Sequence, residues 1–257
     1  MRGLLLISLL IFTFVSFAFG QSSIGETFVG EELHYEIDLW FIKGIAEVTI
    51  FFSRSQTKGR YIITLKGRTK SLAAFASIER SDEYIAIAEE IDGGRRLKTV
   101  YYEENVTLGK RKRQLMCTFD ENRGEWLIKR IKDGSEVREY HLKVPKSSDH
   151  NDFLTAAYNF RYGVYGQIKE GSNYSIPILR RKEFTNYEIT VLRPKNGRSA
   201  LKDYHVLIKV DPDLVNSSSG YVEGWLSSGL YPVEGLIRDV FLFGDVRGRL
   251  IKRVKAN

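Results

Sequence analysis

The side chains that most often carry chemistry are few and scattered in this sequence. Its single cysteine, Cys117, lies between Leu115 and Phe119 in an alternating stretch that would place all three side chains on one face of a strand. Nothing around it indicates an electropositive pocket, so the pattern favours a buried, inert thiol over a reactive one. The four histidines are spread along the chain, and none has zinc-ligand spacing with another histidine or with the cysteine. We therefore predict no metal site and no cofactor.

The densest group of acid, base and ligand side chains is Asp149-His150-Asn151-Asp152. These residues could bind a metal or transfer protons, but they come directly before an expected helix, where an aspartate accepts backbone N–H bonds and complements the helix dipole. Capping is the favoured interpretation. The sequence contains neither a Gly-x-Ser-x-Gly motif nor a phosphate-binding glycine loop. We predict that the protein is not an enzyme; the remaining enzymatic alternative is a hydrolase whose residues converge only in space.

The stronger candidates for a binding site are apolar. Three consecutive residues at an expected hairpin end, and a phenylalanine in the apolar segment 72–76, could line the mouth of a cavity or cover the core from inside. Near the edge of the expected helix's apolar stripe, an arginine could hold an anionic group or bond to strand-end carbonyls. The predicted ligand-binding residues are Trp40, Phe41, Ile42, Phe75, Tyr158 and Arg161.

The chain is mildly basic, with 39 Lys and Arg residues against 32 Asp and Glu residues and a formal net charge of +7. Basic residues gather at 110–113, at 180–182 and along 247–255. They could form a surface for an anionic envelope polymer, or they could be solvated strand ends that keep a β protein soluble. The expected export of the chain disfavours nucleic acid as a partner.

The first 20 residues predict a signal peptide. Arg2 precedes an apolar run over 4–19, and Ala18-Phe19-Gly20 has small residues where a signal peptidase cleaves. The run is short for a membrane span, which needs about 20 residues. No second long apolar stretch follows, so we expect no integral membrane protein. Cleavage would leave residues 21–257 as one β-rich domain in the periplasm or outside the cell.

Alternating apolar and polar residues recur along the rest of the chain. Leu33, Tyr35, Ile37 and Leu39 alternate with charged residues, which is typical of a half-buried antiparallel strand. Turn signals at Lys43-Gly44 and at later Gly and Asn positions separate further runs. We predict strands over 33–39, 45–53, 61–67, 84–90, 97–103, 114–120, 126–132, 137–144, 174–179, 187–192, 204–210, 221–226, 233–243 and 249–254.

One segment follows a helical period instead. Phe153, Ala156, Ala157 and Phe160 have the i, i+3, i+4, i+7 spacing that places side chains on one helix face. Ser148, Asp149 or Asp152 could cap its start, and Gly163 or Gly166 could end it. The combined pattern predicts a mainly β protein, in which a large curved antiparallel sheet, or half-open barrel, surrounds one main α-helix.

Three short motifs resemble a known family. Gly30-Glu31-Glu32-Leu33-x-Tyr35-x-Ile37 with Gly44-Ile45-Ala46, the stretch from Asp149 to Arg161, and the closing stretch 235–250 are similar to exported bacterial proteins known as domain of unknown function 3108. The resemblance implies a fold like the half-open barrels that carry lipoproteins or sense envelope lipids. It implies no catalytic residues.

These observations lead to two functional hypotheses. The first is an exported, non-enzymatic envelope protein that binds a lipid, an acyl chain or a lipidated partner in an apolar groove. The alternative is a structural or interaction module that contacts envelope polymers or proteins through its basic surface or its sheet edges. A cavity open to solvent between the helix and the sheet would favour the first hypothesis, and a space packed solid would favour the second.

Overall fold

The computed structural model describes residues 22–70, 79–145, 151–180, 183–193, 203–215, 217–240 and 244–255. The predicted signal peptide, the segment with Phe75, and Asp149 with His150 lie outside the described residues. Within them the chain forms fourteen strands and three helices. The helices are α1 (Ile24–Phe28), α2 (Phe153–Tyr162) and α3 (Pro212–Val215). The strands are β1 (Glu31–Leu39), β2 (Ile42–Arg54), β3 (Arg60–Thr69), β4 (Arg80–Ile91), β5 (Arg96–Leu108), β6 (Arg111–Asp120), β7 (Glu125–Lys132), β8 (Ser135–Lys143), β9 (Asn173–Arg180), β10 (Glu183–Leu192), β11 (Tyr204–Lys209), β12 (Tyr221–Leu226), β13 (Pro232–Val240) and β14 (Gly244–Lys255).

All fourteen strands join one antiparallel sheet in the order β8-β7-β6-β5-β4-β3-β2-β1-β14-β13-β12-β11-β10-β9. Every neighbour in this order is also a neighbour in sequence, except that β1 pairs with β14, with Glu31 opposite Lys255 and Leu39 opposite Val246. The described strands do not close into a full barrel, because β8 and β9 stand at the two ends of the order. The prediction of a curved, half-open antiparallel sheet is confirmed.

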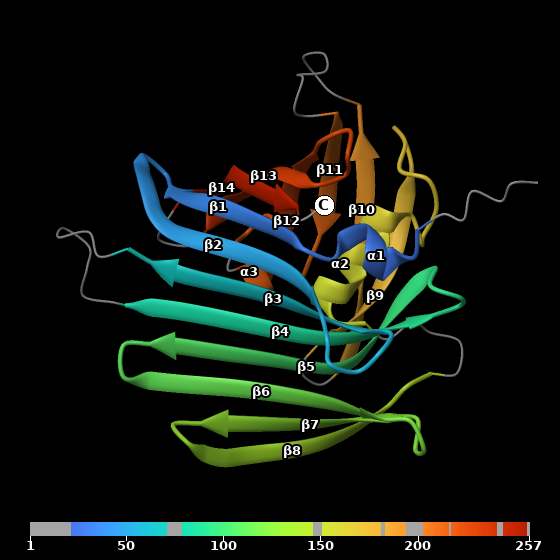
Figure 1. The fold of residues 1–257 in the computed structure, drawn as a ribbon. Helices are drawn as coiled ribbons and strands as arrows, with labels where there is room; N and C mark the ends of the chain where they lie inside the picture. The colour runs from blue at the N-terminus through green and yellow to red at the C-terminus, as the bar shows by residue number, and fades with distance from the viewer. Residues whose placement is uncertain are drawn as a thin grey trace, which may run out of the picture.

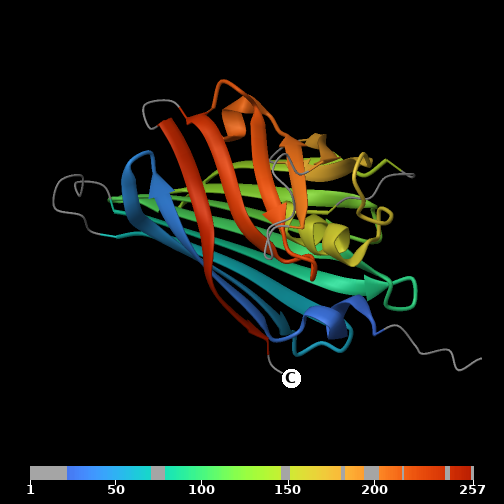
Figure 2. The ribbon, with the colours of Figure 1, turned by 90° about the horizontal axis from the view of Figure 1, so that it is seen from above.

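The sheet folds over along the β1–β14 seam, so that its two halves face each other. Figure 1 shows β1–β8 running side by side across the view, whereas β9–β11 stand at a steep angle to them. Seen from above, β13 and β14 cross over the strands of the other half, and α2 lies at one end between the halves (Figure 2). Register shifts at His34/Tyr35 in β1 and at Trp225/Leu226 in β12 mark bulges, which increase local twist and bend a strand.

Helix α2 divides the interior between two apolar clusters. Leu154 and Tyr158 pack with α1 and the inner face of β2–β7, whereas Ala156 and Phe160 pack against β9–β12. The helix is therefore buried on more sides than the predicted stripe implies. Its predicted end residues are confirmed: Asp152 is the N-cap and Gly163 ends the helix at a φ of 88°. Helix α1 was not predicted, because five residues are too few to show a helical period.

Candidate functional site

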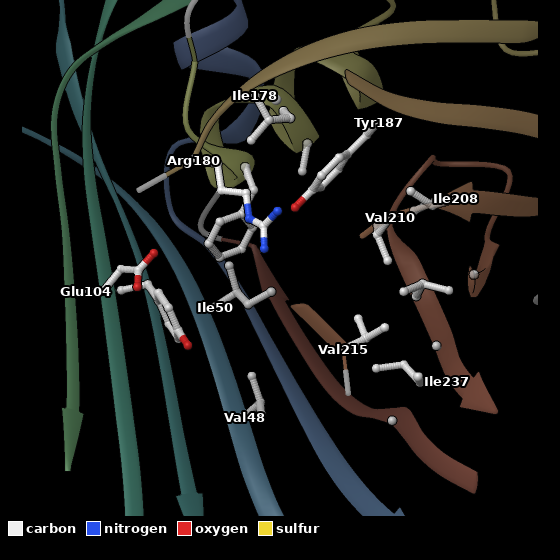
Figure 3. A pocket seen from close by; sticks show the side chains of 18 of the residues that line it. Val48, Ile50, Glu104, Ile178, Arg180, Tyr187, Ile208, Val210, Val215 and Ile237 are labelled. Atoms are coloured by element: carbon white, nitrogen blue, oxygen red, sulfur yellow. The ribbon is translucent and has the colours of Figure 1, made fainter. Parts of the chain in front are cut away.

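A cavity of about 1100 Å³ lies between the two halves of the sheet. Residues of α2 form part of its wall, and Ala157, the exposed residue of this helix, faces into it. The space between α2 and the first half of the sheet is itself packed with apolar side chains. The cavity thus lies beside the helix, and side chains from both halves of the sheet line it (Figure 3).

Apolar side chains make up most of the cavity wall that the structure describes, and aliphatic ones are the largest group among them. From one side Val48 and Ile50 of β2 point inward, and from the other Ile208 and Ile237 do so (Figure 3). The second wall is a continuous ladder, because antiparallel pairing aligns residues of the same face across four strands. Its members are Ile189, Ile208, Val222 and Ile237, each opposite the next.

Next to this ladder runs a row of glycines. Gly224, Gly235 and Gly248 are opposite one another on β12, β13 and β14, and all three line the cavity. A Cβ at Gly224 would lie 3.0 Å from the side chain of Val206, and one at Gly248 would lie 3.1 Å from the side chain of Ile37. At Gly235 a Cβ would make only an ordinary van der Waals contact, 3.9 Å from the backbone oxygen of Glu223, so this position has room for a side chain. Glycine at sheet bends permits strong curvature, and here it also leaves room in the wall.

Three polar side chains reach into the middle of the cavity. Arg180 and Tyr187 approach each other from the second half of the sheet, and Glu104 faces them from β5 (Figure 3). Arg180 forms an ion pair with Asp211, and Tyr102 donates a hydrogen bond to Glu104 at 3.0 Å. Burial raises the pKa of Tyr187 to about 12 despite the opposing charge of Arg180. Tyr187 therefore stays a neutral hydrogen-bonding group at any physiological pH.

The lining carries more positive than negative charge. Among the lining side chains that the structure describes, seven are cationic and three are carboxylates. Four of the cations come from the consecutive strands β6, β7 and β8, so the positive charge is concentrated at one part of the wall. These four are Arg113, Arg130, Lys132 and Arg138.

The structure separates the residues that we predicted for ligand binding. Arg161 lines the cavity, and Tyr158 lies in the apolar core beside it. Trp40 and Phe41 are 74% and 69% exposed at the tip of the β1–β2 hairpin, and with Ile42 they lie outside the cavity lining. Phe75 lies outside the described residues. Neither a role in ligand binding nor its absence follows from these positions, so the assignment stays a prediction.

Arg161 is held by the protein itself. Its Nη1 lies 2.7 Å from one carboxylate oxygen of Glu31, its Nη2 donates to the other at 2.9 Å, and its Nε donates to the backbone carbonyl of Leu230 at 2.8 Å. Its guanidinium also lies over the rings of Phe28 and Tyr158. This residue therefore bonds to a carbonyl in the turn between β12 and β13, and its charge is balanced by Glu31.

Metal binding and nucleophilic chemistry would draw on histidine, cysteine and carboxylate side chains. None of their His, Cys, Asp and Glu side chains form a group of three or more that could hold a metal ion. Cys117 is buried, and burial raises the pKa of its thiol well above the usual range, which suppresses the reactive thiolate. His141 and His205 are paired with carboxylates of Glu125 and Glu223.

Sequence reasoning missed most of the cavity lining. The glycines of the row are separated by 11 and 13 residues, and no sequence motif joins them until the strand register is known. Arg113 and Arg180 belong to basic groups that the sequence marked, but the favoured interpretation there was a solvated surface. The alternation of apolar residues was the only signal that could have identified the aliphatic ladder.

Comparison with known proteins gives a family and a fold. A model of a family described as protein of unknown function (DUF3108) matches residues 34–250. No curated protein matches this chain. Among solved structures, a β-barrel-like protein of domain of unknown function DUF1849 from Brucella abortus is similar, with a TM-score of 0.52 and 13% identity over 89% of this chain and 98% of that one. At this identity the likeness shows the fold alone. No helix among the described residues is long and apolar enough to cross a bilayer.

Proposed function

The chain belongs to the DUF3108 family, and because membership brings no activity with it, we propose a function from the cavity. The protein is a non-enzymatic binding protein that holds a lipid, an acyl chain or a lipidated partner in its apolar interior. The observation that carries this proposal is the cavity of about 1100 Å³ with its aliphatic walls. Small-molecule sites occupy roughly 300–1,000 Å³ and are mostly apolar, so the space suits a ligand of lipid size.

The form of the wall supports an extended apolar ligand. The ladder from Ile189 to Ile237 offers aliphatic contact across four adjacent strands, and Gly235 leaves a recess next to it. Each methylene group transferred from water into such surroundings gains about 0.8 kcal/mol. A chain of ten or more carbons lying along the ladder would therefore bind through its length rather than through any single contact.

The proposal includes a location. The apolar leader over residues 1–20 is the support for export to the periplasm or the cell exterior. A soluble carrier or sensor of lipids is useful in an aqueous compartment next to membranes, because free lipids are almost insoluble in water. The alternative hypothesis, a module that contacts envelope polymers, gains less support because it needs no cavity.

Two variants that introduce the same side chain test the proposal. Gly235→Leu places bulk in the recess of the cavity, whereas Thr118→Leu places it on the exposed outer side of β6. We expect purified wild-type protein and Thr118→Leu to bind a fluorescent fatty acid, and Gly235→Leu to bind it at least about tenfold more weakly, with unchanged circular dichroism. Native mass spectrometry should detect bound lipid after purification from cells. Absence of bound lipid together with no fatty-acid binding by the wild type would refute the proposal.

A further inference from the structure

Four cationic side chains gather on one stretch of the cavity wall. Arg113 of β6 is directly opposite Lys132 of β7, and Arg130 of β7 is directly opposite Arg138 of β8. All four line the cavity. Like charges directly opposite on neighbouring strands are destabilising, so this stretch contains two unfavourable pairs side by side.

Within the part of the chain that the structure describes, carboxylates do not balance this charge. Of the remaining cavity cations, Arg80 is paired with Asp82, Arg161 with Glu31 and Arg180 with Asp211. Among the described side chains, no carboxylate lies within ion-pair distance of the four cations on β6–β8. The one contact found for them is a hydrogen bond of 3.3 Å from Arg138 to the hydroxyl group of Tyr140. The unbalanced charge is thus confined to one part of the cavity.

Strand β6 becomes apolar one step deeper. On β6 the residue two positions from Arg113 on the same face is Leu115, which is buried and also lines the cavity. Side chains two apart on a strand share a face, so the wall changes from cationic to aliphatic within one repeat. A ligand lying along it would meet positive charge at one end and hydrocarbon at the other.

We propose that this cationic wall binds the anionic head group, a carboxylate or a phosphate, of an amphipathic ligand whose hydrocarbon tail occupies the aliphatic part of the cavity. The inference rests on the proposed function and specifies its ligand class. Arginine presents its donors in a planar fork that matches carboxylate and phosphate oxygens, and the cluster contains three arginines. A bound anion would also relieve the repulsion within the two like-charged pairs.

The test compares ligands that share a tail and differ in their head group. Dodecanoate, dodecyl phosphate and dodecanol are each titrated against a neutral, environment-sensitive fluorescent dye bound in the cavity, with inorganic phosphate as a further competitor. We expect the wild type to prefer both anions over dodecanol by about tenfold or more, because charge-assisted hydrogen bonds are the stronger ones. The preference should shrink as ionic strength rises, because the cluster lies near the solvent.

Paired charge-removing variants locate the effect. Arg113→Gln with Lys132→Gln should bring the affinity for the two anions close to that for dodecanol, and should leave dodecanol binding unchanged. The control is Lys110→Gln with Lys112→Gln, which removes the same charge from residues outside the cavity lining and should keep the preference. Thermal melts of all variants confirm that each one is folded.

The outcomes separate this inference from the proposed function. If all three ligands bind the wild type equally, the head-group site is wrong and the apolar cavity remains. If none binds, the proposed function fails as well. If inorganic phosphate competes as strongly as dodecyl phosphate, the site takes free anions, and the assignment to an amphipathic ligand is overturned.

Discussion

Glu31 and Arg161 form an ion pair inside the protein, and both side chains are almost fully buried. Arg253 adds a second, longer contact to Glu31 at 3.2 Å from the solvent side. The pair joins α2 to β1 and, through Arg253, to β14, the two strands at which the sheet folds over. Removal of one partner of a buried pair leaves an uncompensated charge and costs about 3–5 kcal/mol.

We therefore expect Arg161→Met to lower the free energy of unfolding by about 3–5 kcal/mol, measured by urea denaturation. Arg253→Gln is the matched control, because this arginine lies nearer the solvent and Arg161 would still balance Glu31; its effect should be about 1 kcal/mol or less. Similar losses in the two variants would contradict the central role of Arg161.

The same ion pair makes the free energy of unfolding depend on pH. Burial opposes the ionisation of Glu31, but the hydrogen bonds and charges of Arg161 and Arg253 outweigh it and hold its pKa below the ordinary value. A carboxyl whose pKa is lowered by folding contributes stability that is fully present above its unfolded pKa, about 4.3, and is lost as pH falls through its folded pKa. Wild-type stability should fall below about pH 4, and Glu31→Gln should show a flatter acid limb in melts recorded from pH 7 to 3.

At the scale of elements, α2 completes the hydrogen bonding of β5. The side chain of Asn159 accepts from the backbone N–H of Leu97 at 2.9 Å and donates to its carbonyl at 2.8 Å, and Asn151 accepts from the N–H of Thr99. Pairing of β5 with β6 begins only at Tyr101. The asparagines thus take the place of a missing neighbouring strand and fix the helix on the sheet.

Asn159→Leu should cost about 2–4 kcal/mol, because it leaves two buried backbone groups of Leu97 without partners. Asn186→Leu makes the same change at an exposed position of β10 and should alter stability by less than about 0.5 kcal/mol. Equilibrium unfolding and hydrogen exchange at Leu97 measure the effect. Unchanged exchange protection of Leu97 in Asn159→Leu would show that the bond is not needed.

What the sequence predicts well at this scale is local. Alternation located the strands and the spacing of Phe153 and Phe160 located α2, because each signal is contained in a few neighbouring residues. Asn159 lies off the apolar stripe, and its bond to β5 depends on residues 62 positions away. The glycine row and the paired cations likewise exist only once strands are in register, which no local pattern reports.

At the scale of the whole molecule, the sheet has the strand order of a circularly permuted antiparallel meander. Pairing of β1 with β14 brings the two ends of the described chain together, whereas β8 and β9, which are joined through 144–172, stand at opposite ends of the strand order. A chain that began at β9 and ended at β8 would place every strand beside its neighbour in sequence. The family resemblance and the alternation predicted the curved sheet, but neither indicated that β1 pairs with β14.

A circular permutant tests this topology. Joining Lys255 to Ser22 with a Gly/Ser linker and opening the chain within residues 146–150 retains every strand pair. We expect the permutant to have the wild-type circular dichroism spectrum and wild-type affinity for the fluorescent fatty acid. Opening the chain instead at the β3–β4 connection separates two paired strands and serves as the control, with an expected loss of stability. A permutant that fails to fold while the control folds would contradict the strand order.

The β1–β14 seam also sets the timing of folding. Among the described strands β1 is synthesised first and β14 last, so one side of β1 has no partner until β14 has been made. An unpaired strand edge is a template for association with other chains, and contacts between distant residues form slowly. The natural chain should therefore refold more slowly than the permutant and aggregate more readily while it does so. Until β14 pairs with β1, the open edge of β1 is the place where the chain is most exposed to association with other chains.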